Sequence, residues 1–190
     1  MKKIIIFSIF IAAACGIYAF STSKIAITNA DVATTTKSMT EGSIVWHTWS
    51  EAEALNKKNP RKIIVDVFTD WCGWCKVMDR ETFPNKDITK YINEKFYAVK
   101  LNAEQREDIM FDGKKFSFVA NGRSGFHTLA ASLLDNQMSY PTIVYLNEKY
   151  ERIIISPGFK KPEDLIKELK FTAEEQYTKV SFDEYRSKSK

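Results

Sequence analysis

The sequence is poor in the residues that mark fibrous, disulfide-stapled and low-complexity proteins. It has only 7 glycines and 5 prolines in 190 residues, which excludes a collagen-like or low-complexity chain. Its 3 cysteines are too few for a disulfide-stapled scaffold. The 28 basic and 24 acidic residues form no block of one sign, so nothing favours a nucleic-acid partner. With 44% hydrophobic residues, the composition suits one globular domain with a terminal extension, neither disordered nor a multi-span membrane protein.

The long apolar run lies at the N-terminus. Lys2 and Lys3 precede the mostly apolar residues 4–14. This run is too short to cross a bilayer, which takes a helix of roughly 20 residues. It also shows no polar face, which argues against a helix that packs on the domain core. We therefore predict a targeting signal and an exported, periplasmic or extracytoplasmic protein.

Two processing routes fit this segment. Ala19 suits a signal-peptidase site, which gives a signal peptide over residues 1–19. Cys15 follows three alanines that resemble a bacterial lipobox, which gives a lipoprotein signal over residues 1–14 and a lipid on Cys15. Either route exports the protein and removes Cys15 from redox chemistry.

The remainder divides into a linker, a domain and a tail. Residues 20–42 are polar without apolar periodicity and indicate a flexible linker. Residues 43–170 alternate strand and helix patterns, and residues 171–190 form a tail that either docks on the domain or stays loose. Expected strands are residues 44–49, 62–68, 96–101, 142–146 and 150–155. Expected helices are residues 51–58 (with a capping box at Ser50 and Glu53), 72–81, 87–95, 126–134 and one from Pro162. Turn signals stand at Asp112-Gly113 and Asn121-Gly122.

A Cys-x-x-Cys motif follows the most buried expected strand. Cys72 would stand at a helix N-terminus, where free amides and the helix dipole stabilise a thiolate. Cys75 lies one turn further, within reach of a mixed disulfide on Cys72, and Gly73 lets the backbone turn between them. We expect Cys72 to be the accessible thiol of low pKa and Cys75 to be buried.

Two other interpretations of the motif are weaker. A zinc site needs four ligands, and outside the motif the chain offers only His47, His127 and carboxylates, so no metal is expected. A structural disulfide closing so small a loop would stabilise the fold little.

With its surroundings, the motif resembles the thioredoxin superfamily. Residues 65–76 are similar to that family's active-site stretch, residues 99–102 to its next strand and residues 140–142 to its cis-proline loop. Gly158 falls where the family has a glycine after the last hairpin. The Trp-Cys-Gly-Trp-Cys site resembles exported thioredoxin-like proteins.

The resemblance spans residues 44–170 and implies a thioredoxin-like α/β fold. In that fold a central mixed β-sheet is flanked by helices. Residues 103–140 would form an insertion before the cis-proline loop.

Asp66 is expected on the strand face shared with Ile64 and Phe68, where burial of an acid is costly and raises its pKa. The resemblance makes Asp66 the proton acceptor for Cys75 and places Lys100 beside it. The alternatives are that Asp66 reaches solvent or forms a structural pair with Lys100.

The resemblance also suggests substrate contacts. Trp71, Gly73 and Trp74 surround the cysteines, and Trp71 either shields the site or belongs to the core. Pro141, if cis, would hold its loop against the cysteines, so that the Tyr140 backbone pairs with an extended substrate. His127 could approach the cysteines, or could face solvent or cap a helix.

These features predict a thiol–disulfide oxidoreductase that needs no cofactor and uses Cys72 and Cys75. Its partners would be protein thiols and disulfides and an upstream membrane or exported electron donor, and the protein would be a monomer. A reductase or isomerase is favoured over an oxidase. The alternative is a redox-inactive binding module for exported proteins.

Trp74 stands where thioredoxin has proline, and it therefore adds a backbone N–H near the Cys72 sulfur. One hydrogen bond to a thiolate, at roughly 1.5–3 kcal/mol, would raise the reduction potential by roughly 30–60 mV, unless the apolar Trp74 ring cancels this by excluding water from the charge.

Overall fold

The computed structural model describes residues 42–122 and 124–188. The predicted signal, Cys15 and almost all of the predicted linker lie outside these residues.

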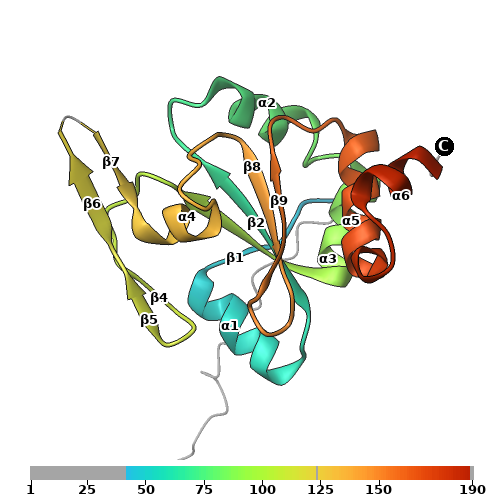
Figure 1. Cartoon of the computed structure of the whole chain (residues 1–190), viewed down its shortest axis with the longest axis horizontal. Helices are drawn as coiled ribbons and strands as arrows, with labels where there is room; N and C mark the ends of the chain where they lie inside the picture. The colour runs from blue at the N-terminus through green and yellow to red at the C-terminus, as the bar shows by residue number, and fades with distance from the viewer. Residues whose placement is uncertain (1–41, 123, 189–190) are drawn as a thin grey trace, which may run out of the picture. The chain divides into compact units, whose positions relative to one another are not determined.

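A five-stranded mixed sheet forms the centre of the domain, in the order β1-β3-β2-β8-β9 (Figure 1). Strands β1 and β2 run parallel to β3, β8 runs antiparallel to β2, and β9 runs antiparallel to β8. The strands are β1 (Trp46–His47), β2 (Lys62–Phe68), β3 (Phe96–Asn102), β8 (Thr142–Leu146) and β9 (Arg152–Pro157). The mixed sheet expected from the resemblance is thus confirmed.

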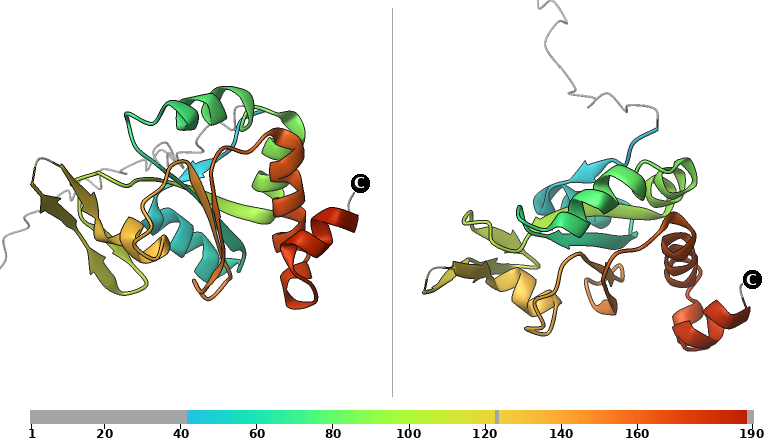
Figure 2. Two further views of the ribbon diagram at one scale, coloured as in Figure 1. Left: turned by 45° about the horizontal axis from the view of Figure 1, so that its top comes forward. Right: turned by 90° about the horizontal axis from the view of Figure 1, so that it is seen from above.

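Helices cover both faces of this sheet (Figure 2). They are α1 (Trp49–Lys58), α2 (Gly73–Glu81), α3 (Lys86–Lys95), α4 (Thr128–Leu133) and α5 (Pro162–Ala173). Because side chains alternate along a strand, Val65 packs in one cluster with residues of α1 and α4. Its neighbour Ile64 packs in a second cluster with residues of α2, α3 and α5. The central strand is therefore buried on both faces, as its β-branched sequence predicts.

The start of α1 corrects the predicted capping box. Thr48 is the N-cap: its hydroxyl accepts the Glu51 N–H at 3.2 Å, and the Glu51 carboxylate accepts the Thr48 N–H at 2.8 Å. The expected strand over 44–49 therefore ends early, because Trp49 already belongs to the helix and is buried in the core. Glu53, the other half of the predicted box, instead accepts the backbone N–H of Asp112.

The insertion forms two hairpins that the strand patterns did not predict. Strands β4 (Ile109–Phe111) and β5 (Lys114–Phe116) pair antiparallel, as do β6 (Phe118–Asn121) and β7 (Ser124–His127). The Asp112-Gly113 signal lies between β4 and β5, and the Asn121-Gly122 signal covers the last residue of β6 and the start of its turn. The expected helix over 126–134 is shorter, because residues 126 and 127 are still paired with β6.

Beyond α5 the chain continues into a short 3-10 helix, η1 (Gln176–Thr178), and α6 (Phe182–Lys188). The predicted boundary between domain and tail at residue 170 falls inside α5, and the segment after α5 packs on that helix. The rings of Tyr177, Phe182 and Tyr185 lie 6.5, 5.2 and 5.1 Å from the ring of the buried Phe171, between centroids. None of the helices in the described part of the chain is long and apolar enough to span a membrane.

Candidate active site

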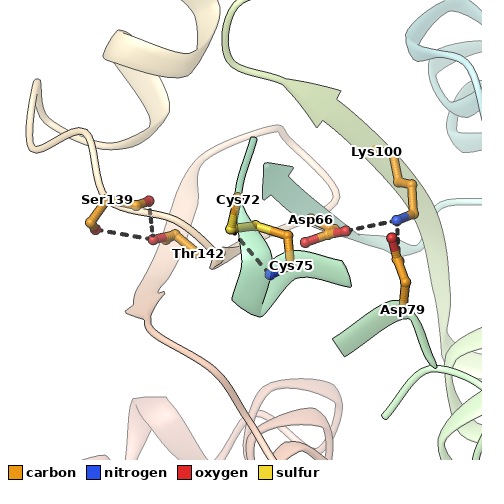
Figure 3. Close-up of a disulfide and its surroundings, with 7 residues drawn as sticks. All are labelled: Asp66, Cys72, Cys75, Asp79, Lys100, Ser139 and Thr142. Carbon is orange, nitrogen blue, oxygen red and sulfur yellow. Dashed lines mark hydrogen bonds and ion pairs between the residues drawn. A yellow bond between two sulfur atoms is a disulfide. The ribbon is translucent and has the colours of Figure 1, made fainter. Parts of the chain in front are cut away.

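The cysteine pair lies where the central strand passes into α2. Cys72 is the N-cap of α2, and the Cys75 N–H donates to the Cys72 sulfur at 3.1 Å. The two residues form a disulfide, with their Cα atoms 5.3 Å apart (Figure 3). An amide at a helix N-terminus thus points at the sulfur, as the sequence predicts, and it would also stabilise a thiolate there. The donor in the disulfide state is the Cys75 amide, and the Trp74 amide stays a predicted donor to the thiolate.

The expected difference in exposure between the two cysteines is wrong for this oxidised state. Cys72 and Cys75 are each 4% exposed. The Cys72 sulfur bonds to the Cys75 sulfur and accepts that residue's N–H.

Asp66 is buried beside the disulfide, between Cys75 and Lys100 in the view of Figure 3. It is 2% exposed, which excludes the predicted alternative of an escape to solvent. Its Oδ2 lies 3.1 Å from the Lys100 Nζ, while Oδ1 has no hydrogen-bond partner in the described residues. Burial raises the pKa of Asp66 to about 6, although the Lys100 charge and hydrogen bond oppose the increase.

Lys100 binds a second carboxylate, that of Asp79 on α2. Its Nζ also lies 5.0, 5.2 and 5.4 Å from the ring centroids of Trp46, Phe68 and Phe83. These contacts are within the range of cation–π attraction and hold the ammonium in one place. Lys100 borders a cavity of about 380 Å³ whose lining includes Trp46.

Two exposed indoles flank the disulfide in sequence. Trp71 is 66% exposed and Trp74 is 62% exposed, so the core alternative for Trp71 is wrong. The Trp71 Nε1 donates to the Glu104 carboxylate at 3.1 Å, and its ring meets Tyr140 edge-on at 5.8 Å. The Trp74 ring packs at 5.3 Å on Phe159. Solvent-facing rings held in this way provide apolar contact area beside the cysteines.

The Tyr140–Pro141 peptide is cis, as the resemblance implies. Its loop faces the disulfide in Figure 3, where the Thr142 hydroxyl donates to the Ser139 carbonyl at 2.8 Å. The Pro141 carbonyl accepts the Gly158 N–H at 2.7 Å, which ties the loop to the end of β9. Gly158 has φ +87°, in the region that favours glycine.

His127 takes the capping role among its predicted alternatives. It is fully buried, its Nδ1 accepts the Leu129 N–H at 3.3 Å, and its Nε2 lies 3.2 Å from the Glu107 carbonyl oxygen. Within residues 42–122 and 124–188, no three histidine, cysteine or acidic side chains gather in a way that could hold a metal ion.

Sequence reasoning missed three residues that support the site: Asp79, Glu104 and Phe159. Asp79 could have been found, because a residue four positions after Cys75 lies on the same helix face. Glu104 and Phe159 carry no such signal, since each follows a strand end and reaches its indole only through the folding of a loop.

The fold and the cysteine pair define a thioredoxin-like protein, which confirms the predicted fold class. A thioredoxin-fold protein from Helicobacter pylori has a TM-score of 0.53 at 20% identity, covering 68% of this chain and 80% of that one. A thioredoxin from Thermus thermophilus has a TM-score of 0.52 at 17% identity, covering 68% and 87%. The family model Thioredox_DsbH, described as "Protein of unknown function, DUF255", matches residues 31–184, and the chain belongs to this family.

The curated relatives are much longer proteins, and each matches this chain over a short segment. Uncharacterized protein B0495.5 of Caenorhabditis elegans is 33% identical over 84 residues, which are 44% of this chain and 12% of that protein. Spermatogenesis-associated protein 20 of Homo sapiens is 34% identical over 82 residues, which are 42% of this chain and 10% of that protein. The chain thus spans about a tenth of the length of these relatives.

Proposed function

We propose that this protein is a thiol–disulfide oxidoreductase that acts on exported proteins through Cys72 and Cys75. The observation that carries the proposal is the disulfide at the first turn of α2, where the Cys75 N–H donates to the Cys72 sulfur. A donor in that position stabilises the thiolate form of Cys72 after reduction, and the thiolate is the species that attacks a disulfide.

The proposed reaction begins with the reduced pair. The Cys72 thiolate attacks one sulfur of a substrate disulfide; the substrate S–S bond breaks, and its other sulfur leaves as a thiolate that takes a proton from water. Cys75 then loses its proton and attacks the Cys72 sulfur of the mixed disulfide. The second substrate sulfur leaves, and two electrons have passed from the cysteine pair to the substrate.

Asp66 is the acceptor that we assign to the Cys75 proton. Its Oδ1 has no hydrogen-bond partner in the described part of the chain, whereas Oδ2 is held by Lys100. A pKa of about 6 keeps Asp66 largely ionised near neutral pH yet basic enough to take a proton. The transfer runs directly or through one water molecule.

Substrate would bind over the indoles and the cis-proline loop. Trp71 and Trp74 offer exposed apolar surface next to the disulfide, and Gly73 between them is exposed, with open space where a Cβ would stand. The backbone of Tyr140, before Pro141, would pair with an extended substrate segment as an added strand.

The compartment, partners and direction of electron flow belong to the same proposal. The charged and apolar start of the sequence supports export to the periplasm or another extracytoplasmic space, with a lipid anchor if Cys15 is modified. We propose a monomer that an upstream membrane or exported donor keeps reduced, and that acts as a reductase or isomerase.

The test is reduction of insulin by the protein with dithiothreitol, followed by precipitation of the freed chain. We expect wild-type activity well above the uncatalysed rate and none from Cys72→Ser. Equal activity of wild type and Cys72→Ser would instead favour a redox-inactive binding module.

A second experiment tests the order of the cysteines. Cys75→Ser should accumulate a mixed disulfide with a reporter protein on non-reducing gels, because nothing resolves the bond on Cys72. Cys72→Ser should not. A mixed disulfide only through Cys75 would reverse the two roles.

A further inference from the structure

Asp66 and Asp79 share one cation. The Lys100 Nζ contacts the Oδ2 of Asp66 and the Oδ1 of Asp79, and Figure 3 shows both carboxylates meeting the Lys100 nitrogen, to the right of the disulfide in that view. Two carboxylates and one ammonium carry a net charge of −1 when all are ionised. Asp66 therefore does not have the Lys100 charge to itself.

The positions of these groups are set by different elements. Lys100 is the direct register partner of Asp66 across β2 and β3. Asp79 belongs to α2, four residues after Cys75, so both lie on the same face of that helix. The helix that carries the proposed resolving thiol thus also carries the acid that engages Lys100.

We propose that Asp79 is a positioning residue for the proton-transfer step, because it engages the Lys100 ammonium and so keeps Asp66 able to accept a proton. The inference rests on the proposed function only for that step; the electrostatic coupling stands on the geometry alone. Without Asp79, Lys100 would serve Asp66 alone, and the ionised form of Asp66 would become a fixed ion-pair partner.

The charged and titratable groups around Asp66 come from the neighbouring elements of the sheet and from α2. Strand β3 supplies Lys100, α2 supplies Asp79 and the Cys75 thiol of the reduced state, and β8 places the uncharged Ile143 opposite Asp66. The Asp79 charge raises the pKa of Asp66 and the Lys100 charge lowers it. The three aromatic rings around Lys100 keep its ammonium in place when one carboxylate is removed.

The test follows the Asp66 carboxyl carbon by NMR as a function of pH in the oxidised full-length protein. In Asp79→Asn we expect the Asp66 titration midpoint to fall by roughly half to one pH unit, less than the 1–3 units of a direct ion-pair partner. In Lys100→Met it should rise. Asp79→Glu should restore the wild-type midpoint.

Glu81→Gln is the matched control, since it removes one negative charge from the same helix but from a residue that pairs with Arg80. Its midpoint should equal that of the wild type. An unchanged Asp66 midpoint in Asp79→Asn, or in Lys100→Met, would overturn the proposal.

A kinetic readout separates this inference from the proposed function. The starting species is the protein with a small thiol bound to Cys72 as a mixed disulfide, and the rate at which that thiol is released is measured as a function of pH. In Asp79→Asn the pH midpoint of this rate should fall together with the titration midpoint of Asp66. If the NMR midpoint falls but no variant reduces a disulfide, the coupling holds and the proposed function fails. If the wild type reduces insulin, but its thiol-release profile and its Asp66 midpoint equal those of Asp79→Asn, the inference about Asp79 is wrong and the proposed function stands.

Discussion

Single residues of the site show what burial costs. Strand β2 is apolar except for Lys62 at its first position and Asp66 near its end. Asp66 lies within the core layer and has one ion-pair partner of opposite charge, Lys100, which is itself shared. A carboxylate in such a place is tolerated at a loss of stability, which supports a chemical role for it.

The first prediction concerns the stability cost of Asp66. Its pKa rises from 3.8 to about 6 on folding, so the folded state binds the proton more tightly than the unfolded state. The ionised form therefore destabilises the fold above about pH 6, by on the order of 3 kcal/mol, and this loss disappears as the pH falls toward 4. Asp66→Asn should be more stable than wild type at pH 7, by up to about 3 kcal/mol, with the difference vanishing near pH 4.

Urea unfolding at several pH values measures this difference. Glu81→Gln serves as a control for charge removal and should follow the wild type throughout. Equal stability of Asp66→Asn and wild type at pH 7 would contradict the account of Asp66.

The second prediction concerns Trp74. The Cys75 amide already bonds to the Cys72 sulfur, so the Trp74 amide would be a second donor to the thiolate. Trp74→Pro removes that N–H and should lower the reduction potential by about 30 mV, the low end of the range that one hydrogen bond supports. It should also raise the pKa of the Cys72 thiol.

Equilibration with glutathione gives the potential, and Trp74→Phe, which keeps the N–H and an aromatic ring, should retain the wild-type value. If Trp74→Pro also retains it, the exposed indole serves substrate contact instead.

At the scale of elements, the insertion depends on close packing that its sequence pattern does not predict. In the β6–β7 hairpin, Gly125 lies under the Phe118 ring: a Cβ built at Gly125 would be 2.1 Å from the Phe118 Cζ and 2.6 Å from the Val119 carbonyl oxygen. Glycine is thus required for a close approach of backbone and ring.

The third prediction is that Gly125→Ala destabilises the protein by about 1–3 kcal/mol, the usual cost of overpacking. Gly73→Ala is the control, because a Cβ at Gly73 meets no atom within 4 Å. Adding Phe118→Ala to Gly125→Ala should recover only part of the loss, since the Val119 carbonyl remains in the way. Chemical denaturation measures all three, and full recovery in the double variant would refute the backbone contribution.

At the scale of the whole molecule, the tail and the insertion lie at opposite ends of the described domain (Figures 1 and 2). Helix α6 contacts the domain through Phe182 and Tyr185, which pack on the buried Phe171 of α5. These ring contacts are made with α5, whereas the cysteine pair lies at the start of α2. The tail should therefore contribute to stability without setting the redox chemistry.

The fourth prediction follows: truncation after Val180 should lower the free energy of unfolding by about 1–2 kcal/mol, because two half-buried aromatic rings are lost. The reduction potential should stay at the wild-type value. Denaturant unfolding and a glutathione titration of the same sample measure both, and a changed potential would show that the tail influences the site.

The sequence by itself determined the local features of this protein. The β-branched run of β2, the Cys-x-x-Cys spacing and the Pro162 helix start depend on a few neighbouring residues, so the order of strands and helices and the places of Cys72, Cys75 and Asp66 could be predicted from them. The thioredoxin-like fold class came from family resemblance. The pairing of Asp66 with Lys100 came from family resemblance, and the register of β2 on β3 supplies its reason. The Thr48 cap shows the limit of such patterns, because Thr48-x-x-Glu51 and Ser50-x-x-Glu53 satisfy the same rule.

The tertiary structure alone decided which side chains from distant segments meet. Three contacts join segments far apart in the chain: Asp79 with Lys100, Trp71 with Glu104, and Trp74 with Phe159. The burial of both cysteines and the hairpins of the insertion depend on packing. Strands β4 and β6 have only three and four residues, too few for a strand pattern to stand out, so tertiary contacts determine whether they form. The chemistry of the cysteine pair is thus encoded locally, while its electrostatic setting and its surface are products of the fold.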